Sequence, residues 1–303
     1  MAPTQLTEVP SPAVDLSASY SPGRRIRDGA FRLLISGSVV LALATLVVLL
    51  ADLLIEGWPR LSWDLVTSFP SARPDRAGIQ SAIWGSIWVV GLTATISLPL
   101  GIGAAIYLEE FANGQRWYNR FIELNIQNLA AVPSIVWGIL GLAFVARGPL
   151  GLGFTVLTAA IVLSLLVLPT VVIATREALR AVPTSVRQAS LALGATQWQT
   201  IWRQVLPSAV PGIATGSILS TSRALGESAP LLLLGALTFV TFNPEGLDSS
   251  YTVLPLQIFR FISEARPEFR PLAAAASVVL LVMLLGMNAV AIYLRNHFEK
   301  KTR

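Results

Sequence analysis

Residues 154–208 read FTVLTAAIVLSLLVLPTVVIATREALRAVPTSVRQASLALGATQWQTIWRQVLPS and combine two kinds of pattern. Residues 154–175 form an apolar block without charges, and a helix needs about 20 such residues to cross the hydrocarbon core of a membrane. Residues 176–208 are polar and contain the start and stop signals of short helices. The stretch therefore predicts a membrane-spanning helix followed by a folded loop.

The loop 176–208 is predicted to hold two short helices. Ser185 and Thr196 can each cap a helix, because a Gln three residues later can complete a capping box. Gly194 can adopt the left-handed conformation that ends the first helix. Pro207 is expected to close the second helix. The prediction is a helix–turn–helix on the cytoplasmic face of the membrane.

The same kind of apolar block recurs on both sides of this stretch. The chain has 303 residues, of which 13% are charged, whereas about 25% is usual in soluble proteins. A short amphipathic helix is expected at 256–262, in the loop 238–271. The predicted fold is all-α, a polytopic membrane protein with six transmembrane helices. The predicted spans are 33–55, 81–108, 126–146, 154–175, 209–237 and 272–294.

The basic residues give the orientation of these spans. With the N-terminus inside, 14 of the 22 Lys and Arg residues fall in cytoplasmic segments and seven in outer segments. Basic residues are enriched in cytoplasmic loops. Both termini and the loop 176–208 are therefore expected in the cytoplasm. Glu109 and Glu110 end the second span on that side and are expected to be solvated.

These assignments divide the chain into four segments. Residues 1–28 are expected to be a flexible cytoplasmic tail, because much of this stretch is rich in Pro, Ser and Thr without periodicity. Residues 29–78 hold the first membrane helix and an outer loop. Residues 79–294 hold five membrane helices and the loop 176–208. Residues 295–303 are expected to form a basic cytoplasmic tail.

The loop also contains a spaced motif. Permeases of ABC importers have the signature E-A-A, three residues, Gly, nine residues, I-x-L-P. The spacing fits throughout, although Gln188, Ser190 and Gln204 depart from the consensus. The loop resembles this signature, and the resemblance implies a MetI-like permease fold and a helix that docks into a cleft of a separate ATP-binding subunit. An amphipathic loop resting on lipid headgroups is the alternative. The matching residues are Gln188, Ala189, Ser190, Gly194, Gln204, Val205, Leu206 and Pro207.

Three further stretches, at 105–112, 129–142 and 215–236, resemble the permeases of bacterial phosphate importers. The short loop after the first span favours the PstA type over the similar PstC type. The resemblance implies a bacterial plasma (inner) membrane protein with a PstC-like sister permease, two copies of a PstB-like ATP-binding subunit and an extracytoplasmic PstS-like phosphate-binding protein. ATP and Mg are then expected in the ATPase, with no cofactor in this chain.

Arg223 and Glu227 are charged residues within the fifth predicted span. Four residues apart in a helix, they would share one face, which Gly216 and Ser220 extend. A charge exposed to lipid costs about 3 kcal/mol or more, so this face should line the bundle interior or a hydrated path. A guanidinium can bind two phosphate oxygens at once. Arg223 and Ser220 are therefore predicted to line a phosphate pathway, with Glu227 moderating the charge. A buried ion pair that only fixes helix packing is the alternative.

Neither a catalytic nor a metal site is predicted. The sequence has no Cys, and its one His, His297, lies in the charged C-terminal segment. Lys300 and Lys301 are the only lysines, so a Walker A loop followed by its helix cannot occur, and ATP would have to bind another subunit.

Two alternative functions remain open. The same architecture could transport another oxyanion, such as phosphonate, sulfate or molybdate. An intramembrane enzyme or a membrane scaffold is a different class, and an enzyme would need a nucleophile with a base, or a metal cluster, at membrane depth. The sequence offers no such set of residues.

Overall fold

The computed structural model describes residues 22–113, 115–234 and 239–302, and the regular elements in these ranges are all helices. The chain divides into two units, Met1–Asp52 and Leu53–Arg303. The apolar helix α1, Pro22–Gly57, makes up the described part of the first unit and continues to the start of the second. It begins inside the segment 1–28 that was expected to be a tail, whose residues 1–21 lie outside the described ranges.

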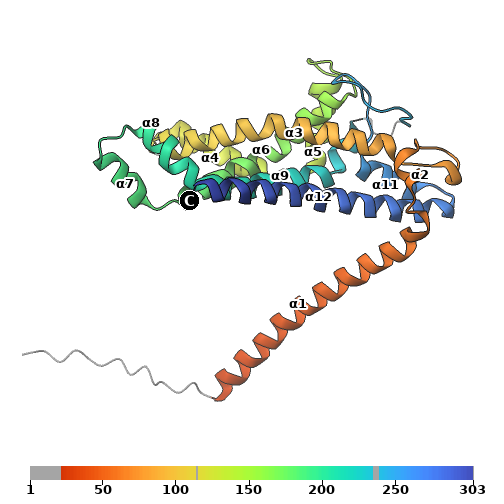
Figure 1. Ribbon diagram of the computed structural model, residues 1–303, viewed down its shortest axis with the longest axis horizontal. Coiled ribbons are helices and arrows are strands. Elements are labelled where there is room, and N and C mark those ends of the chain that lie inside the picture. Colours follow the sequence, from red (N-terminus) through yellow and green to blue (C-terminus); the bar gives the residue numbers. More distant parts are fainter. Residues whose placement is uncertain (1–21, 114, 235–238, 303) are drawn as a thin grey trace, which may run out of the picture. The chain divides into compact units, whose positions relative to one another are not determined.

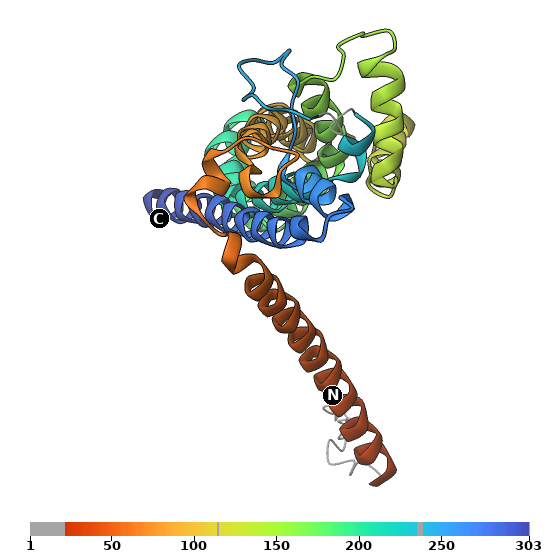
Figure 2. The ribbon, with the colours of Figure 1, turned by 90° about the vertical axis from the view of Figure 1, so that its right-hand side faces the viewer.

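The second unit is a bundle of long helices with shorter helices at both ends (Figures 1 and 2). In Figure 1 the short helices α7 and α8 lie at one end of this bundle, and α2 and α11 lie at the other. The long helices are α3 (Gln80–Ile106), α6 (Val156–Arg180), α9 (Leu206–Gly226) and α12 (Arg270–Thr302). The shorter α-helices are α2 (Trp63–Thr67), α4 (Trp117–Ala130), α5 (Ser134–Leu140), α7 (Thr184–Ala192), α8 (Gln197–Thr200), α10 (Ala229–Leu233) and α11 (Leu254–Ser263). Three π-helical segments, η3 (Tyr107–Phe111), η4 (Gly141–Ala146) and η5 (Ile201–Val205), follow α3, α5 and α8, and the 3-10 turns are η1 (Trp58–Arg60), η2 (Pro74–Arg76) and η6 (Pro267–Phe269).

Four helices in the described ranges are long and apolar enough to cross a membrane, or five if one bent pair counts as a span. Six were predicted. The remaining predicted span corresponds to α9, which ends at Gly226 and whose many Ser, Thr and Gly residues lower its hydropathy. The helices that meet the criterion are Arg27–Arg60, Gln80–Phe111, Val156–Arg180 and Pro267–His297, with Trp117–Ala130 and Ser134–Ala146 as the bent pair.

The bent pair replaces the straight span that was predicted at 126–146. The chain bends by 105° between its two helices. Pro133 lies at the break with φ −55° and ψ 137°, and its ring lacks the N–H that a continuous helix would need there. Helix breaking at Pro133 explains why the apolar sequence does not form one straight rod.

Helix α6 is the centre of the bundle and packs most extensively against α3 and α9. Gly216 of α9 allows a close approach, because a Cβ there would lie 2.5 Å from the Cβ of Ala174 on α6. Ser220, one turn later, is 1% exposed. Of the two environments predicted for the face through Gly216 and Ser220, the structure shows the bundle interior at these two positions, where α9 is packed against α6.

The structure contains the predicted amphipathic helix but no separate C-terminal tail within the described residues. Helix α11, Leu254–Ser263, confirms the amphipathic helix, with Leu256 and Phe261 buried and Phe259 and Ile262 exposed. The C-terminal segment 295–303 does not separate from the last span, because α12 continues through Thr302.

Candidate functional site

Within the loop 176–208, helix α7 ends at a glycine. Gly194 has φ +83°, the left-handed conformation that favours glycine. Its N–H donates to the Leu191 carbonyl at 2.9 Å, and the Ala195 N–H donates to the Ser190 carbonyl at 3.2 Å. This pair of bonds is a Schellman motif, which satisfies the last carbonyls of α7. The prediction that Gly194 ends this helix in a left-handed conformation is confirmed.

The start of α8 is held by the predicted capping box. The Thr196 hydroxyl accepts from the Gln199 N–H at 3.2 Å, and the Thr196 N–H donates to Gln199 Oε1 at 3.0 Å. The hydroxyls of Ser190 on α7 and Thr200 on α8 lie 2.9 Å apart and share a hydrogen bond. Because both helix ends are satisfied and the helices are joined side chain to side chain, α7 and α8 form one stiff unit.

Two details of the predicted loop are wrong. Ser185 does not cap α7, because the helix begins at Thr184 after Pro183, whose ψ of 138° already turns the chain out of the helix. Pro207 does not close the second helix, because α8 continues through the π-helical η5 into α9. The wider turn of η5 directly before Pro207 accommodates the proline ring. As a result, α8 and α9 form a continuous helical rod.

The loop presents an apolar projection at its end of the bundle. Leu193 is 89% exposed, and the motif residues Gln188, Ala189 and Gly194 are exposed beside it. Of the remaining motif residues, Gln204 is exposed, Val205 is buried and three are half-buried. A groove of about 490 Å³ lies between α7 and the α8–η5 segment. The half-buried motif residues are Ser190, Leu206 and Pro207, and the groove is lined in part by Val186, Ala189, Ser190, Leu193, Gln199 and Gln204.

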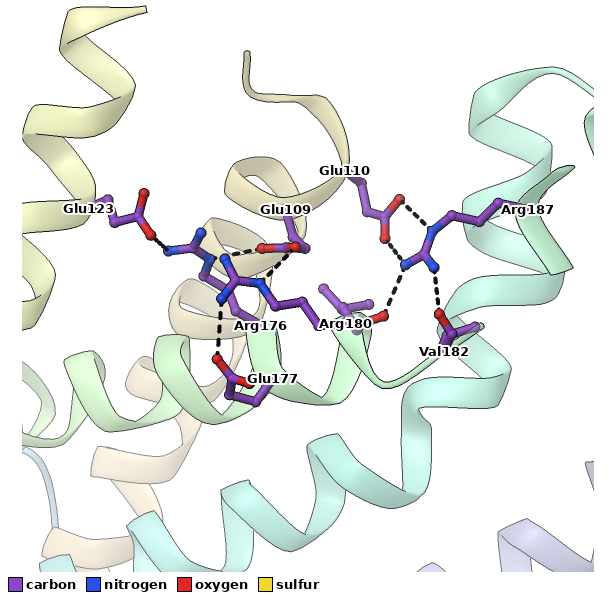
Figure 3. A network of polar contacts seen from close by, with 9 residues as sticks. Glu109, Glu110, Glu123, Arg176, Glu177, Arg180, Val182 and Arg187 are labelled. Carbon is purple, nitrogen blue, oxygen red and sulfur yellow. Dashed lines mark hydrogen bonds and ion pairs between the residues drawn. The ribbon is translucent and has the colours of Figure 1, made fainter. Parts of the chain in front are cut away.

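At the same end of the bundle, a network of ion pairs connects helices α3, α4, α6 and α7 (Figure 3). It was not predicted from the sequence. Glu109 accepts from Arg176 Nε at 3.1 Å and from Arg180 Nε at 2.9 Å. Arg176 also donates to Glu123 at 2.9 Å. These bonds tie the end of α3 to α6 and α4. The full network consists of Glu109, Glu110, Glu123, Arg176, Glu177, Arg180 and Arg187.

The expectation that Glu109 and Glu110 are solvated is wrong. Their side chains are 17% and 9% exposed, and both form ion pairs with arginines of the α6–α7 region. A signal was present in the sequence, because the predicted topology places these two Glu residues and Arg176, Arg180 and Arg187 at span ends on the same membrane side. Opposite charges at neighbouring span ends favour pairing over solvation when helices pack closely.

The structure does not bring the predicted pathway residues together. Helix α9 ends at Gly226, and Glu227 is extended with φ −79° and ψ 124°, so the prediction that Arg223 and Glu227 share a helix face is wrong. Glu227 is half-buried. The Ser220 hydroxyl donates to the Gly216 carbonyl of its own helix at 2.9 Å. The Arg223 side chain is exposed and forms no hydrogen bond or ion pair with any residue in the described ranges.

A different side of α9 has a groove lined partly by polar side chains. A space of about 300 Å³ lies between α9, α12 and Leu98 of α3. Near the middle of α9, Arg295 Nη1 donates to the Thr215 hydroxyl at 2.8 Å. The polar residues that line this space are Ser217, Thr221, Asn288 and Arg295.

Residues 97–303, from within α3 to the C-terminus and including the whole loop, match the family described as "Binding-protein-dependent transport system inner membrane component". The chain belongs to this family. It is a multi-pass membrane permease of the ABC transporter class, and the MetI-like permease fold expected from the sequence is confirmed.

Relatives of this permease include phosphate permeases. It is 33% identical to the probable ABC transporter permease protein YqgI of Bacillus subtilis over 85% of this chain and 91% of that one. It is 34% identical to the phosphate transport system permease protein PstA 1 of Mycobacterium tuberculosis strain H37Rv over 89% of this chain and 88% of that one. The resemblance to PstA-type permeases is therefore confirmed. A bacterial alginate ABC transporter shares the fold, with a TM-score of 0.68 and 17% identity over 90% of this chain and 96% of that one.

Proposed function

We propose that this permease is the transmembrane subunit of an ATP-driven importer that moves inorganic phosphate into the cytoplasm. The observation that carries the proposal is the stiff α7–α8 unit, which presents Leu193 beside the exposed motif residues at one end of the bundle and continues into α9. A separate motor subunit that binds this unit could move α9 directly. The similarity to PstA 1 supports phosphate as the cargo.

Arg223 supports the assignment of an anionic cargo. Its guanidinium is exposed on α9, and no carboxylate in the described ranges neutralises it. Arginine keeps its charge at every relevant pH and matches two phosphate oxygens with paired donors. Within the membrane an unpaired charge is costly unless it faces a hydrated path or a ligand. The pathway in this proposal therefore passes Arg223, without the fixed Arg223–Glu227 pair that the sequence suggested.

The assembly that fits this role contains four kinds of subunit. The permease would pair with a PstC-like sister permease, two PstB-like ATPases that hold ATP and Mg, and an extracytoplasmic PstS-like binding protein. Both termini and the α7–α8 unit would lie in the cytoplasm, in the plasma (inner) membrane of a bacterium. The basic side chains near the loop, such as Arg180 and Arg203, agree with that orientation.

Vesicles containing the assembled complex are expected to accumulate labelled phosphate only when ATP is supplied on the side of the ATPase. Excess unlabelled phosphate should compete fully, whereas sulfate, molybdate and a phosphonate should compete weakly, because a binding protein for phosphate would have to reject these other oxyanions. Strong competition by one of the other oxyanions would reassign the cargo. If no ATPase copurifies with the chain, the importer assignment itself is lost and a scaffold role is favoured.

A further inference from the structure

The π-helical end of α3 contacts both helices of the α7–α8 unit. The Glu110 carboxylate accepts two hydrogen bonds from Arg187 on α7, with Oε1–Nη2 at 2.7 Å and Oε2–Nε at 3.4 Å (Figure 3). The Glu110 carbonyl accepts from Gln197 Nε2 on α8 at 2.6 Å. A single residue at the end of α3 therefore holds α7 by its side chain and α8 by its backbone.

The Arg187 guanidinium is fixed from a second direction. It donates to the Val182 carbonyl at 2.8 Å and to the Leu179 carbonyl at 2.9 Å, at the turn between α6 and α7. The side chains of Arg187 and Glu110 are 23% and 9% exposed. A pair withdrawn from water and held by further hydrogen bonds orients its partners, whereas an exposed pair contributes little. The pair therefore sets the position of α7 relative to the end of α3.

The next residue adds an aromatic contact on the α8 side. The Phe111 ring lies 6.0 Å from the Trp198 ring, which in turn lies 5.3 Å from Trp202. Trp198 and Trp202 belong to the helical rod that continues into α9. Aromatic pairs at these separations are attractive beyond the area that they bury. Ionic, backbone and ring contacts thus converge on the two residues that end η3.

The chain connectivity makes this contact mechanically important. The α7–α8 unit is covalently joined to α6 and α9, but its connection to α3 near the loop is made through noncovalent contacts such as these. We propose that Glu110, together with Arg187 and Gln197, forms the joint that transmits movement of the α7–α8 unit to α3 during transport. The inference rests on the proposed function and gives Glu110 a positioning role, without contact to phosphate.

Loss of the joint should uncouple ATP hydrolysis from transport. In the complete complex reconstituted in vesicles, Glu110→Gln is expected to lower phosphate transported per ATP hydrolysed by about tenfold, with ATPase activity retained. The amide would place an N–H donor against the second Arg187 donor. Arg187→Gln should have the same effect. The double variant should be no worse than either single variant, because the two residues act as one unit.

Two further variants separate coupling from folding. Glu177→Gln removes the exposed ion pair that Glu177 forms with Arg180 within α6. This variant should change the phosphate transported per ATP hydrolysed by less than about twofold. Gln197→Ala leaves the buried ion pair intact and removes only the contact to the Glu110 carbonyl. Gln197→Ala should lower the phosphate transported per ATP hydrolysed by about threefold, so the joint can be tested even if the Glu110→Gln complex fails to assemble.

These measurements distinguish failure of the proposed joint from failure of the proposed function. A reduced yield of complex with an unchanged transport-to-hydrolysis ratio in Glu110→Gln, Arg187→Gln and Gln197→Ala would refute the joint and leave only a structural role. If the wild-type complex neither binds an ATPase nor transports phosphate, the proposed function fails first. A normal wild-type ratio that falls in these three variants, and not in Glu177→Gln, establishes the joint.

Discussion

Replacing Arg223 with Gln is expected to lower the initial rate of phosphate uptake by about ten- to hundredfold at phosphate concentrations below saturation. The exposed guanidinium has no partner in the described ranges, so its donors are available to an anion. Glutamine stays polar and uncharged, but it is shorter and lacks the paired donors. The rate is measured with labelled phosphate in vesicles that hold the complete complex and ATP.

Two control variants sharpen this test of Arg223. Lysine keeps the charge without the planar fork, so Arg223→Lys should retain an intermediate rate. Arg270 is another exposed arginine, at the start of α12, and Arg270→Gln should stay within about twofold of wild type. Uptake by Arg223→Gln at the wild-type rate would remove Arg223 from the pathway and leave it a role in helix packing.

Replacing Leu193 with Asp is expected to weaken association of the permease with its ATPase by about ten- to hundredfold. Leu193 is 89% exposed beside the exposed motif residues of the stiff α7–α8 unit, so a partner that binds this unit would cover it. A carboxylate there would have to be desolvated in the interface. The amount of ATPase recovered with the purified permease measures the effect, and ATP-driven uptake should fall in parallel.

The matched control for Leu193 adds the same charge elsewhere on α7. Thr184 is exposed at the first position of this helix, where a carboxylate is favourable. Thr184→Asp should therefore leave ATPase recovery close to wild type. Equal loss in both variants would indicate a general effect of charge, and no loss in either would place the motor contact on another surface.

The loop was the part of the chain that sequence reasoning predicted best. Gly194 and the pair Thr196 and Gln199 form the expected stop and cap, because these signals act through bonds between residues close in the chain. Ser185 failed as a cap because it is already the second residue of α7, which begins at Thr184 after Pro183. Pro207 failed as a stop because η5 precedes it, and nothing in the sequence marks a π-helical turn.

The fifth predicted span shows how apolar composition can conceal a break. Gly226 and Pro230 flank the position where α9 ends and α10 begins, and such a Gly–Pro pair is a known helix-end signal. The apolar residues after Pro230 extended the predicted span beyond this signal. Because the predicted span ran past this break, Glu227 was predicted on the same helix face as Arg223. In the structure the helix ends before Glu227.

The charge network depends on tertiary packing, which sequence periodicity does not report. Glu109 and Glu110 are consecutive, yet the first pairs with Arg176 and Arg180 on α6 and the second with Arg187 on α7. Each partner is more than sixty positions away in sequence. Only the three-dimensional arrangement of α3, α6 and α7 selects these partners.

The proposed transport mechanism requires the α7–α8 unit to lie on the cytoplasmic side, where an ATPase can bind it. The chain has no cysteine, so Leu193→Cys introduces a single thiol at a position that is 89% exposed. A membrane-impermeant maleimide should label this thiol in inside-out vesicles and leave it unlabelled in intact cells, and bound ATPase should protect it. Labelling in intact cells would place the unit on the outer face and contradict the account.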